Sequence, residues 1–295
     1  MTRTNTRALT IGSRSPAPVA IGPDAPLAII AGPCLLESLE LGLDIGHACK
    51  AACERLGVGY VFKASFDKAN RSSITSPRGP GLEQGLAWLA TIRDELGVPI
   101  TTDLHEPAQA EPVASTCDLL QIPAFLCRQT DLLVATGIAA DKHGRAVNIK
   151  KGQFVSPSEM LGPVRKLHQA GCDDALLTDR GTFFGYHRLV TDLIGLGDLL
   201  ELDCSSFTDL GPPPVCFDAT HSAQQPGIGE QSGGYRHRVP QLARAAVALG
   251  VHAVFIETHP DPDRAMSDAA TQLRLDDFEQ LIEQLAAIRR SVPLR

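Results

Sequence analysis

Six basic side chains stand at or just after short apolar runs of the kind that form buried strands. They are Lys63, Lys68, Arg71, Arg128, Lys150 and Arg180. The whole chain is acidic, with a formal net charge of -7, so cations gathered on one face would create a focused positive potential. Such a site suits phosphates and carboxylates, because arginine gives bidentate contacts and lysine a point charge. One such residue alone is best interpreted as a solvated surface charge, but six favour an anion-binding site.

A second set of side chains has the composition of a metal site. It comprises Cys34, His221, Glu257 and Asp268. This mixture of sulfur, nitrogen and oxygen suits a divalent zinc, iron, manganese or cobalt ion and leaves room for a water or a substrate oxygen. The spacing carries no local metal-binding signature, and the alternative is a buried cysteine, a core histidine and two solvated acids. The residue types alone leave both interpretations open.

The elements that must position these side chains are apolar runs alternating with helical patterns. Eight runs rich in Val, Ile and Leu are expected as strands: 27–33, 59–63, 99–103, 119–123, 146–150, 175–179, 215–218 and 253–257. About eight strand and helix alternations predict an α/β fold, a (β/α)₈ TIM barrel. The polar residues then collect at the carboxyl ends of the strands, where barrel enzymes build their active sites. A doubly wound sheet is the structural alternative, but it usually needs fewer strands.

The two ends of the chain fit this architecture. A helical stripe near the C-terminus is formed by Phe278, Leu281, Ile282, Leu285 and Ile288. At the N-terminus, short apolar segments at 8–11 and 19–21 flank a turn and predict a β-hairpin. We expect this extension, residues 1–23, to cap the bottom of the barrel. Since no linker or repeat divides the chain, we expect a single domain over residues 1–295.

Composition excludes other classes of protein. The acidic balance of 27 Lys and Arg against 34 Asp and Glu argues against nucleic-acid binding, which needs a basic surface. No apolar run reaches the roughly 18–20 residues needed to cross a bilayer, so we expect no membrane span. The eight cysteines include no CxxC pair, which predicts reduced thiols and a cytoplasmic location.

Nine short motifs resemble those of a known enzyme family. They are AGPC (31–34) with ES (37–38), FKASFDKANRSS (62–73), TDLHE (102–106), QIPAFLCR (121–128), VNIKKGQF (147–154), TDRGTFFG (178–185), DATHSAQ (218–224), ETHP (257–260) and SDAATQL (267–273). The pattern resembles 3-deoxy-D-manno-octulosonate 8-phosphate synthase over about residues 27–275. This family has a (β/α)₈ barrel and is usually a homotetramer. The resemblance implies a transferase that condenses phosphoenolpyruvate with arabinose 5-phosphate and water, releasing phosphate, in lipopolysaccharide biosynthesis.

The resemblance also assigns the metal ligands. One form of the family needs a divalent metal and has cysteine after the first strand, whereas the other form has asparagine there. Cys34 places this sequence with the metal-dependent form, and the other three implied ligands are His221, Glu257 and Asp268. The ion is expected to be zinc, iron, manganese or cobalt.

Substrate-binding and catalytic residues follow from the same resemblance. The residues implied to bind phosphoenolpyruvate are Lys63, Lys68, Lys150, Arg180 and the backbone of Ala124, and Gln121 is expected as a further substrate-binding residue. Those implied to bind arabinose 5-phosphate are Asn70, Arg71 and Ser72, with Arg128 reaching into a neighbouring subunit's site. The expected catalytic groups are Lys63, Asp103, His221 and Asp268. A glycine-rich stretch at 227–236 departs from the family's usual wording, and a mobile lid is expected there.

Three other functions remain as alternatives. The nearest is the sister synthase that uses erythrose 4-phosphate, which shares the barrel, the metal and the phosphoenolpyruvate site but lacks the ANRSS segment. A Schiff-base aldolase would use Lys63 or Lys150, and needs a lysine with a depressed pKa. A sugar-phosphate binding protein is the non-enzymatic alternative, but it leaves the four potential metal ligands without a purpose.

Overall fold

Eight parallel strands form the centre of the molecule. The computed structural model describes residues 6–70, 73–226 and 233–292. The strands are β3 (Ala28–Gly32), β4 (Gly59–Lys63), β5 (Ile100–Asp103), β6 (Leu119–Ile122), β7 (Ala146–Lys150), β8 (Ala175–Asp179), β9 (Val215–Asp218) and β12 (Ala253–His259). Each pairs with the next in this order, and β12 pairs in parallel with both β9 and β3, which closes the barrel. The predicted TIM barrel is confirmed.

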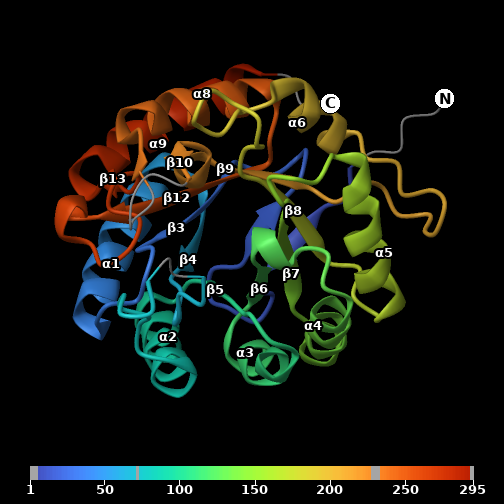
Figure 1. Cartoon of the computed structure of the whole chain (residues 1–295), viewed down its shortest axis with the longest axis horizontal. Helices are drawn as coiled ribbons and strands as arrows, with labels where there is room; N and C mark the ends of the chain where they lie inside the picture. Colours follow the sequence, from blue (N-terminus) through green and yellow to red (C-terminus); the bar gives the residue numbers. More distant parts are fainter. Residues whose placement is uncertain (1–5, 71–72, 227–232, 293–295) are drawn as a thin grey trace.

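Helices surround these strands as a ring (Figure 1). They are α1 (Leu39–Leu56), α2 (Leu82–Leu96), α3 (Ala110–Thr116), α4 (Thr130–His143), α5 (Leu161–Gln169), α6 (Leu193–Leu200), α7 (Ala219–Ser222), α8 (Val239–Leu249) and α9 (Leu275–Ser291). Short 3₁₀ turns lie at Pro107–Gln109, Ala124–Leu126, Ser158–Met160, Arg236–Arg238 and Pro262–Arg264. The apolar stripe predicted on α9 faces inward, since Phe278, Leu281 and Leu285 are buried there. The main core therefore lies between the helix ring and the barrel wall.

The N-terminal hairpin closes the amino end of the barrel. Strands β1 (Leu9–Ile11) and β2 (Val19–Ile21) pair antiparallel, as predicted. Ile11 and Ile21 are fully buried in an apolar cluster with Leu119 and Ala146, which are the first residues of β6 and β7. Because those residues begin their strands, the hairpin covers the end opposite the carboxyl rim. Its apolar side chains keep water out of the lower half of the barrel.

The last barrel strand is longer than the sequence pattern indicates. It was expected to end at Glu257, but it continues to His259. The reason is an additional short strand, β13 (Leu273–Arg274), whose Leu273 pairs with Thr258. The segment between β12 and β13 is thereby tied back onto the barrel rim at both of its ends. That segment carries Asp268.

A close backbone approach explains the glycine before the first rim residues. A Cβ atom on Gly32 would lie 2.0 Å from the backbone oxygen of Lys63, so any larger residue would force β3 and β4 apart at this point. The glycine lets the chain after β3 pass directly over the end of β4. This brings Cys34 next to Lys63, whose ammonium donates a hydrogen bond to the Cys34 backbone oxygen at 3.1 Å.

The sequence predicts no segment that crosses a membrane, and the length and apolar character of the helices bear on this prediction. Among the described residues, no helix combines the length and the apolar character needed to cross a bilayer.

Candidate active site at the carboxyl rim of the barrel

A cavity of about 620 Å³ opens at the carboxyl ends of the strands. Eleven of the residues expected in the site line it: Lys63, Lys68, Asn70, Asp103, Gln121, Ala124, Lys150, Arg180, His221, Glu257 and Asp268. They come from strands β4 to β9 and β12 and from the segments that follow them. Parallel strands place their carboxyl ends on one rim, so groups distant in sequence meet there.

Two buried lysines in the cavity are each paired with a carboxylate. Lys63 Nζ lies 2.5 Å from Glu257 Oε1, and the two side chains are 2% and 0% exposed. Lys150 Nζ lies 2.5 Å from Asp218 Oδ2 in equally deep burial. Each pair neutralises a charge that would be costly to bury alone.

A phenylalanine ring forms the floor below both lysines. Lys150 Nζ lies 3.6 Å and Lys63 Nζ 5.3 Å from the centre of the Phe255 ring. Phe255 also belongs to the apolar cluster that contains the N-terminal hairpin. It therefore separates the apolar lower half of the barrel from the charged upper half, and its ring face attracts the two cations.

His221 is held by the residue that ends strand β9. The Asp218 side chain caps α7 by accepting a hydrogen bond from the His221 backbone nitrogen at 2.8 Å. Its Oδ2 lies 2.8 Å from His221 Nδ1. Burial opposes protonation of the imidazole, but the charges of Asp218 and Glu257 outweigh it and raise the pKa of His221. With Nδ1 turned toward Asp218, Nε2 is the ring nitrogen directed at the other site residues.

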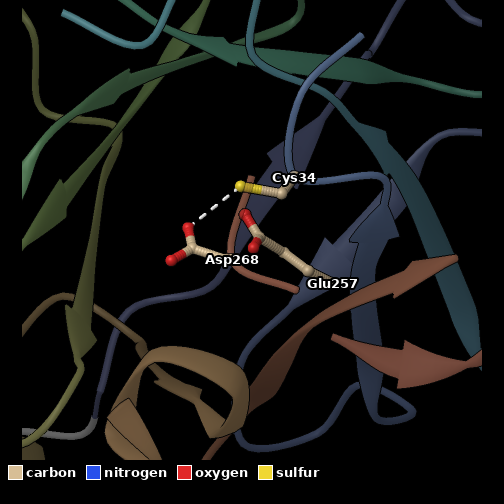
Figure 2. Close-up of side chains that lie close together, drawn as sticks. All are labelled: Cys34, Glu257 and Asp268. Atoms are coloured by element: carbon tan, nitrogen blue, oxygen red, sulfur yellow. Dashed lines mark hydrogen bonds between the residues drawn. The ribbon is translucent and has the colours of Figure 1, made fainter. Parts of the chain in front are cut away.

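Three side chains at this rim lie close together, as Figure 2 shows: Cys34, Glu257 and Asp268. One potential ligand atom from each lies within 4.8 Å of the others, and Cys34 Sγ is 3.0 Å from Asp268 Oδ2. His221 does not belong to this compact group, but its Nε2 lies 3.7 Å from Glu257 Oε2 and 3.7 Å from Asp268 Oδ2. The four residues expected as ligands are thus neighbours.

The chemistry of this group fits a divalent cation. Glu257 Oε2 is buried and has no hydrogen-bond partner among the described residues, so it is an acceptor available to an ion. Burial, together with the charges of Asp268 and Glu257, raises the pKa of the Cys34 thiol well above its ordinary value. A thiol in this position loses its proton readily only when a cation compensates the charge. Two carboxylates and a thiol at this separation are the donors of such a site.

Asp268 has an unusual backbone. Its φ is 49°, in the left-handed region that few residues other than glycine adopt. The backbone is kept there by hydrogen bonds that its carbonyl oxygen accepts from Thr271 and Gln272 at 3.0 and 3.1 Å. A strained backbone at a side chain that faces a cavity is typical of functional sites.

The cavity is also lined by positive charge. Arg180 is 6% exposed, and its Nη1 has no hydrogen-bond partner in the described part of the chain. Burial opposes the charge on Lys68, but Cys34, Glu257, Asp103 and Asp268 outweigh it and raise the pKa of Lys68. Both residues therefore present positive charge to the cavity beside Lys63 and Lys150.

A second histidine and carboxylate pair borders the cavity. His105 Nε2 lies 3.1 Å from Asp103 Oδ2, and both side chains are almost fully buried. Burial opposes the charge on Asp103, but His105 and Lys68 outweigh it and lower the pKa of that carboxyl. Asp103 is therefore ionised at neutral pH and favours the protonated form of His105, whose pKa is raised.

Gln121 is supported from below by buried polar groups. Asn148 Nδ2 donates to Gln121 Oε1 at 3.3 Å, and Thr178 Oγ1 donates to Asn148 Oδ1 at 2.6 Å. All three side chains are buried inside the barrel. The chain of hydrogen bonds fixes the Gln121 amide at the cavity wall.

Comparison with known proteins places the chain in a family. The family model described as the DAHP synthetase I family matches residues 6–292. The chain belongs to the DAHP synthetase I family. A relative from Nitratidesulfovibrio vulgaris (strain DP4) is 52% identical over 88% of this chain and 91% of its own length. A relative from Chelativorans sp. (strain BNC1) is 52% identical over 90% of this chain and 92% of its own length. A relative from Desulfotalea psychrophila is 48% identical over 93% of this chain and 94% of its own length.

All three relatives carry the name 2-dehydro-3-deoxyphosphooctonate aldolase. This is another name for 3-deoxy-D-manno-octulosonate 8-phosphate synthase, so the resemblance found in the motifs is confirmed. The family description alone covers the erythrose 4-phosphate alternative as well. The names of these relatives do not favour that alternative.

One expected substrate residue lies outside the cavity, and two others are not among the described residues. Arg128 is exposed and does not line it; its backbone oxygen accepts a hydrogen bond from Lys166 at 3.1 Å. It follows the 3₁₀ turn after β6, which carries it away from the rim. Arg71 and Ser72 lie outside the described residues, as do residues 227–232 of the expected lid. Of the six basic side chains, Lys63, Lys68, Lys150 and Arg180 meet at the cavity in the described part of the chain.

Four residues that shape the site were not among the substrate-binding, catalytic or metal-binding residues expected from the sequence. They are His105, Gln153, Gln224 and Phe255. Gln224, His105 and Gln153 stand within motifs that carried the resemblance, which was the available signal. Phe255 gave none, because an apolar residue in a strand is an ordinary feature.

Proposed function

We propose that this chain condenses phosphoenolpyruvate with arabinose 5-phosphate and water, giving 3-deoxy-D-manno-octulosonate 8-phosphate and inorganic phosphate. The product belongs to lipopolysaccharide biosynthesis. The observation that carries the proposal is a single rim cavity in which four cations adjoin a thiol, an imidazole and two carboxylates. It is also supported by the names of relatives whose sequences are about 50% identical to this chain.

The cations would align the two anionic substrates. Lys63, Lys68, Lys150 and Arg180, with Gln121 and the Ala124 backbone, would hold phosphoenolpyruvate. Asn70, Arg71 and Ser72 would hold the pentose phosphate. Fixing both reactants turns a bimolecular encounter into a nearly intramolecular one, an effect worth about 7–11 kcal/mol. The same positive charges stabilise the departing phosphate.

We further propose that Cys34, His221, Glu257 and Asp268 hold a divalent ion, which is zinc, iron, manganese or cobalt. When bound, such an ion supplies Lewis-acid polarisation of the aldehyde and helps to orient the reactants. The support for it is the buried Glu257 Oε2, which has no hydrogen-bond partner among the described residues. The donor set supports it as well, because thiolate, imidazole and carboxylate suit these ions.

The protein's own groups would move the protons. C3 of phosphoenolpyruvate attacks the aldehyde carbon, water adds at C2, and the C2–O bond to the phosphate breaks. The new sugar hydroxyl needs one proton, and the attacking water must lose one. The pair of Asp103 and His105, which is not assigned to the ion, is placed to carry them. His221, oriented by Asp218, and Asp268 would carry a proton only while they are not bound to the ion. Lys63, held 2.5 Å from Glu257, would stabilise the developing negative charge.

We propose a homotetramer in which Arg128 completes a neighbour's pentose phosphate site. Its exposure and its absence from the cavity of its own chain support this assignment. Substitution of Arg128 by alanine should raise the KM for arabinose 5-phosphate and leave that for phosphoenolpyruvate unchanged. A cytoplasmic location is also proposed, and the eight cysteines, all free and buried, support it.

Turnover with two aldehydes tests the proposed reaction. Arabinose 5-phosphate should be used in strong preference to erythrose 4-phosphate, and the reverse preference would establish the sister activity. In water enriched in oxygen-18, the label should enter the sugar product. Label in inorganic phosphate would instead show P–O cleavage and overturn the proposed course of the reaction.

One observation favours the Schiff-base alternative enough to require its own test. Burial, with some help from the charge of Lys63, lowers the pKa of Lys150. However, Lys63 Nζ and Lys150 Nζ each lie 2.5 Å from a buried carboxylate, and an amine engaged in such a pair is not free to attack a carbonyl. Borohydride reduction in the presence of pyruvate should therefore give no covalent adduct.

A further inference from the structure

The side chain of Gln224 joins the two halves of the cavity. Arg180 Nη2 donates a hydrogen bond to Gln224 Oε1 at 2.5 Å, and Gln224 Nε2 donates one to Asp268 Oδ1 at 2.7 Å. Arg180 and Gln224 are 6% and 8% exposed. A single neutral side chain thus connects a cation of the anion site with a carboxylate of the metal site.

The orientation of this amide is fixed by its partners. A guanidinium can only donate hydrogen bonds, so the amide oxygen must face Arg180 and the amide nitrogen must face Asp268. Glutamate lacks the donor and asparagine is one methylene shorter, so neither of these close substitutes can make both hydrogen bonds.

The backbone of Gln224 is held in place independently of these contacts. Gln224 and Gln225 form β10, which pairs with β11 (Gly233–Gly234). The Tyr235 backbone nitrogen donates to the Ala223 oxygen at 2.9 Å, and Gln225 Nε2 donates to the Tyr235 hydroxyl at 2.6 Å. Gln224 thus extends from a braced segment, which is what a residue that positions others requires.

We propose that Gln224 is a positioning residue that fixes Arg180 and Asp268 relative to each other, so that the anion site and the metal site are built as one unit. It acts through these two residues, while Arg180 Nη1, without a partner in the described chain, is left for the anion. The inference rests on the proposed function, since it takes phosphoenolpyruvate as the anion and a divalent ion as the cation.

Direct binding measurements on the full chain test this role. Gln224→Met removes both hydrogen bonds at nearly constant volume, and Gln224→Asn keeps the polar groups but shortens their reach. Calorimetric titration with phosphoenolpyruvate should give a Kd about tenfold higher for either variant, as expected when hydrogen bonds to charged groups are lost. Titration of the metal-free protein with cobalt(II), followed by its visible and thiolate absorption, should also show a higher Kd. The KM for arabinose 5-phosphate should stay unchanged.

Gln241→Met is the control, because it makes the same chemical change at an exposed position on α8, outside the cavity. It should leave both Kd values unchanged. If the Gln224 variants match this control in both titrations, the inference is overturned, even if they are less thermally stable.

A double-mutant cycle separates positioning from direct contact. If Gln224 acts through Arg180, the double variant Arg180→Lys and Gln224→Met should bind phosphoenolpyruvate no more weakly than Arg180→Lys alone. Full additivity would show that Gln224 contacts the anion itself and would overturn the positioning role. Neither titration requires turnover. A wild-type protein that binds both ligands but forms no product would therefore refute the proposed function and leave this inference unaffected.

Discussion

Individual charges in this site are stabilised by specific neighbours rather than by solvent. Lys63 and Glu257 form one buried pair, and Lys150 and Asp218 form another. Burying either partner alone would leave an uncompensated charge, which costs far more than the pair contributes. The site can therefore keep a high density of charge out of water only as long as its pairs are intact.

Removal of one partner should be strongly destabilising. We expect Lys63→Met to lower the free energy of unfolding by about 3–5 kcal/mol, because Glu257 is left charged and buried. Urea denaturation measures the change. The control is Arg55→Met, which breaks an exposed pair with Glu279 and should have little effect. Equal effects of the two substitutions would contradict this account.

Cys34 gives a test of the proposed metal site at the same scale. Chelation should abolish activity of the wild-type protein, and an added divalent ion should restore it. Cys34→Asn should bind cobalt(II) without the thiolate absorption and at least about tenfold more weakly. The control is Cys49→Ala, which changes a buried thiol on α1 remote from the rim, and this variant should retain the absorption. Unaltered cobalt spectra in Cys34→Asn would exclude the cysteine as a ligand.

At the scale of secondary structure, the residues that begin and end each strand have different tasks. Asp218 ends β9, caps α7 and orients His221. At the other end of the barrel, His252 precedes β12, and its Nδ1 accepts a hydrogen bond from the Val215 backbone nitrogen at 3.0 Å. Residues at the carboxyl end of a strand thus serve chemistry, and those at the amino end serve stability, as is general for this fold.

His252 predicts a component of acid sensitivity. Burial, with the nearby charge of Arg289, lowers the pKa of His252 to about 4. The unfolded chain, with an ordinary histidine pKa near 6.5, binds more protons than the folded chain between these two values. Stability from this residue is therefore complete above pH 6.5 and is lost as the pH falls toward 4, by up to about 3 kcal/mol.

Asparagine at this position removes the titration. In His252→Asn, the amide oxygen can still accept from the Val215 nitrogen, but no proton is taken up. We expect the difference in unfolding free energy between pH 7 and pH 4.5 to be smaller than in the wild-type protein. The matched control is His47→Asn, an exposed histidine on α1 that should leave the difference unchanged. An unchanged difference in His252→Asn would contradict the prediction.

At the scale of the whole molecule, the barrel is closed at one end and open at the other. The hairpin seals the amino end with apolar side chains, and Phe255 marks the boundary below the charged rim. Water and substrates therefore reach the interior from the carboxyl end, where the cavity lies. Stability and catalysis are placed at opposite ends of the same eight strands.

This separation predicts that the hairpin can be weakened without altering the site. Ile11→Ala should lower the free energy of unfolding by about 2–5 kcal/mol, since Ile11 is fully buried, and should leave the KM for phosphoenolpyruvate unchanged. Thr10→Ala, at the exposed position next to it, should change neither quantity. A raised KM in Ile11→Ala would show that the two ends are coupled.

Much of the architecture was predictable because it depends on local patterns. Apolar runs predicted each barrel strand, and the short apolar segments at 8–11 and 19–21 predicted the N-terminal hairpin. The end of β12 was not predictable, since Thr258 and His259 become strand only by pairing with β13, which lies more than ten residues further along the chain. Pairing across such a distance leaves no local signal.

For the site, residue types alone determined that an acidic chain carries cations and potential metal ligands at its strand ends, and the motifs determined the family. Only the tertiary structure decided which of them meet. It brought Arg180 and Asp268 within reach of one glutamine, left Arg128 on the outside, and set Phe255 beneath two lysines. The physical reason is that barrel closure and the path of each rim loop fix these distances, and both depend on packing between segments far apart in sequence.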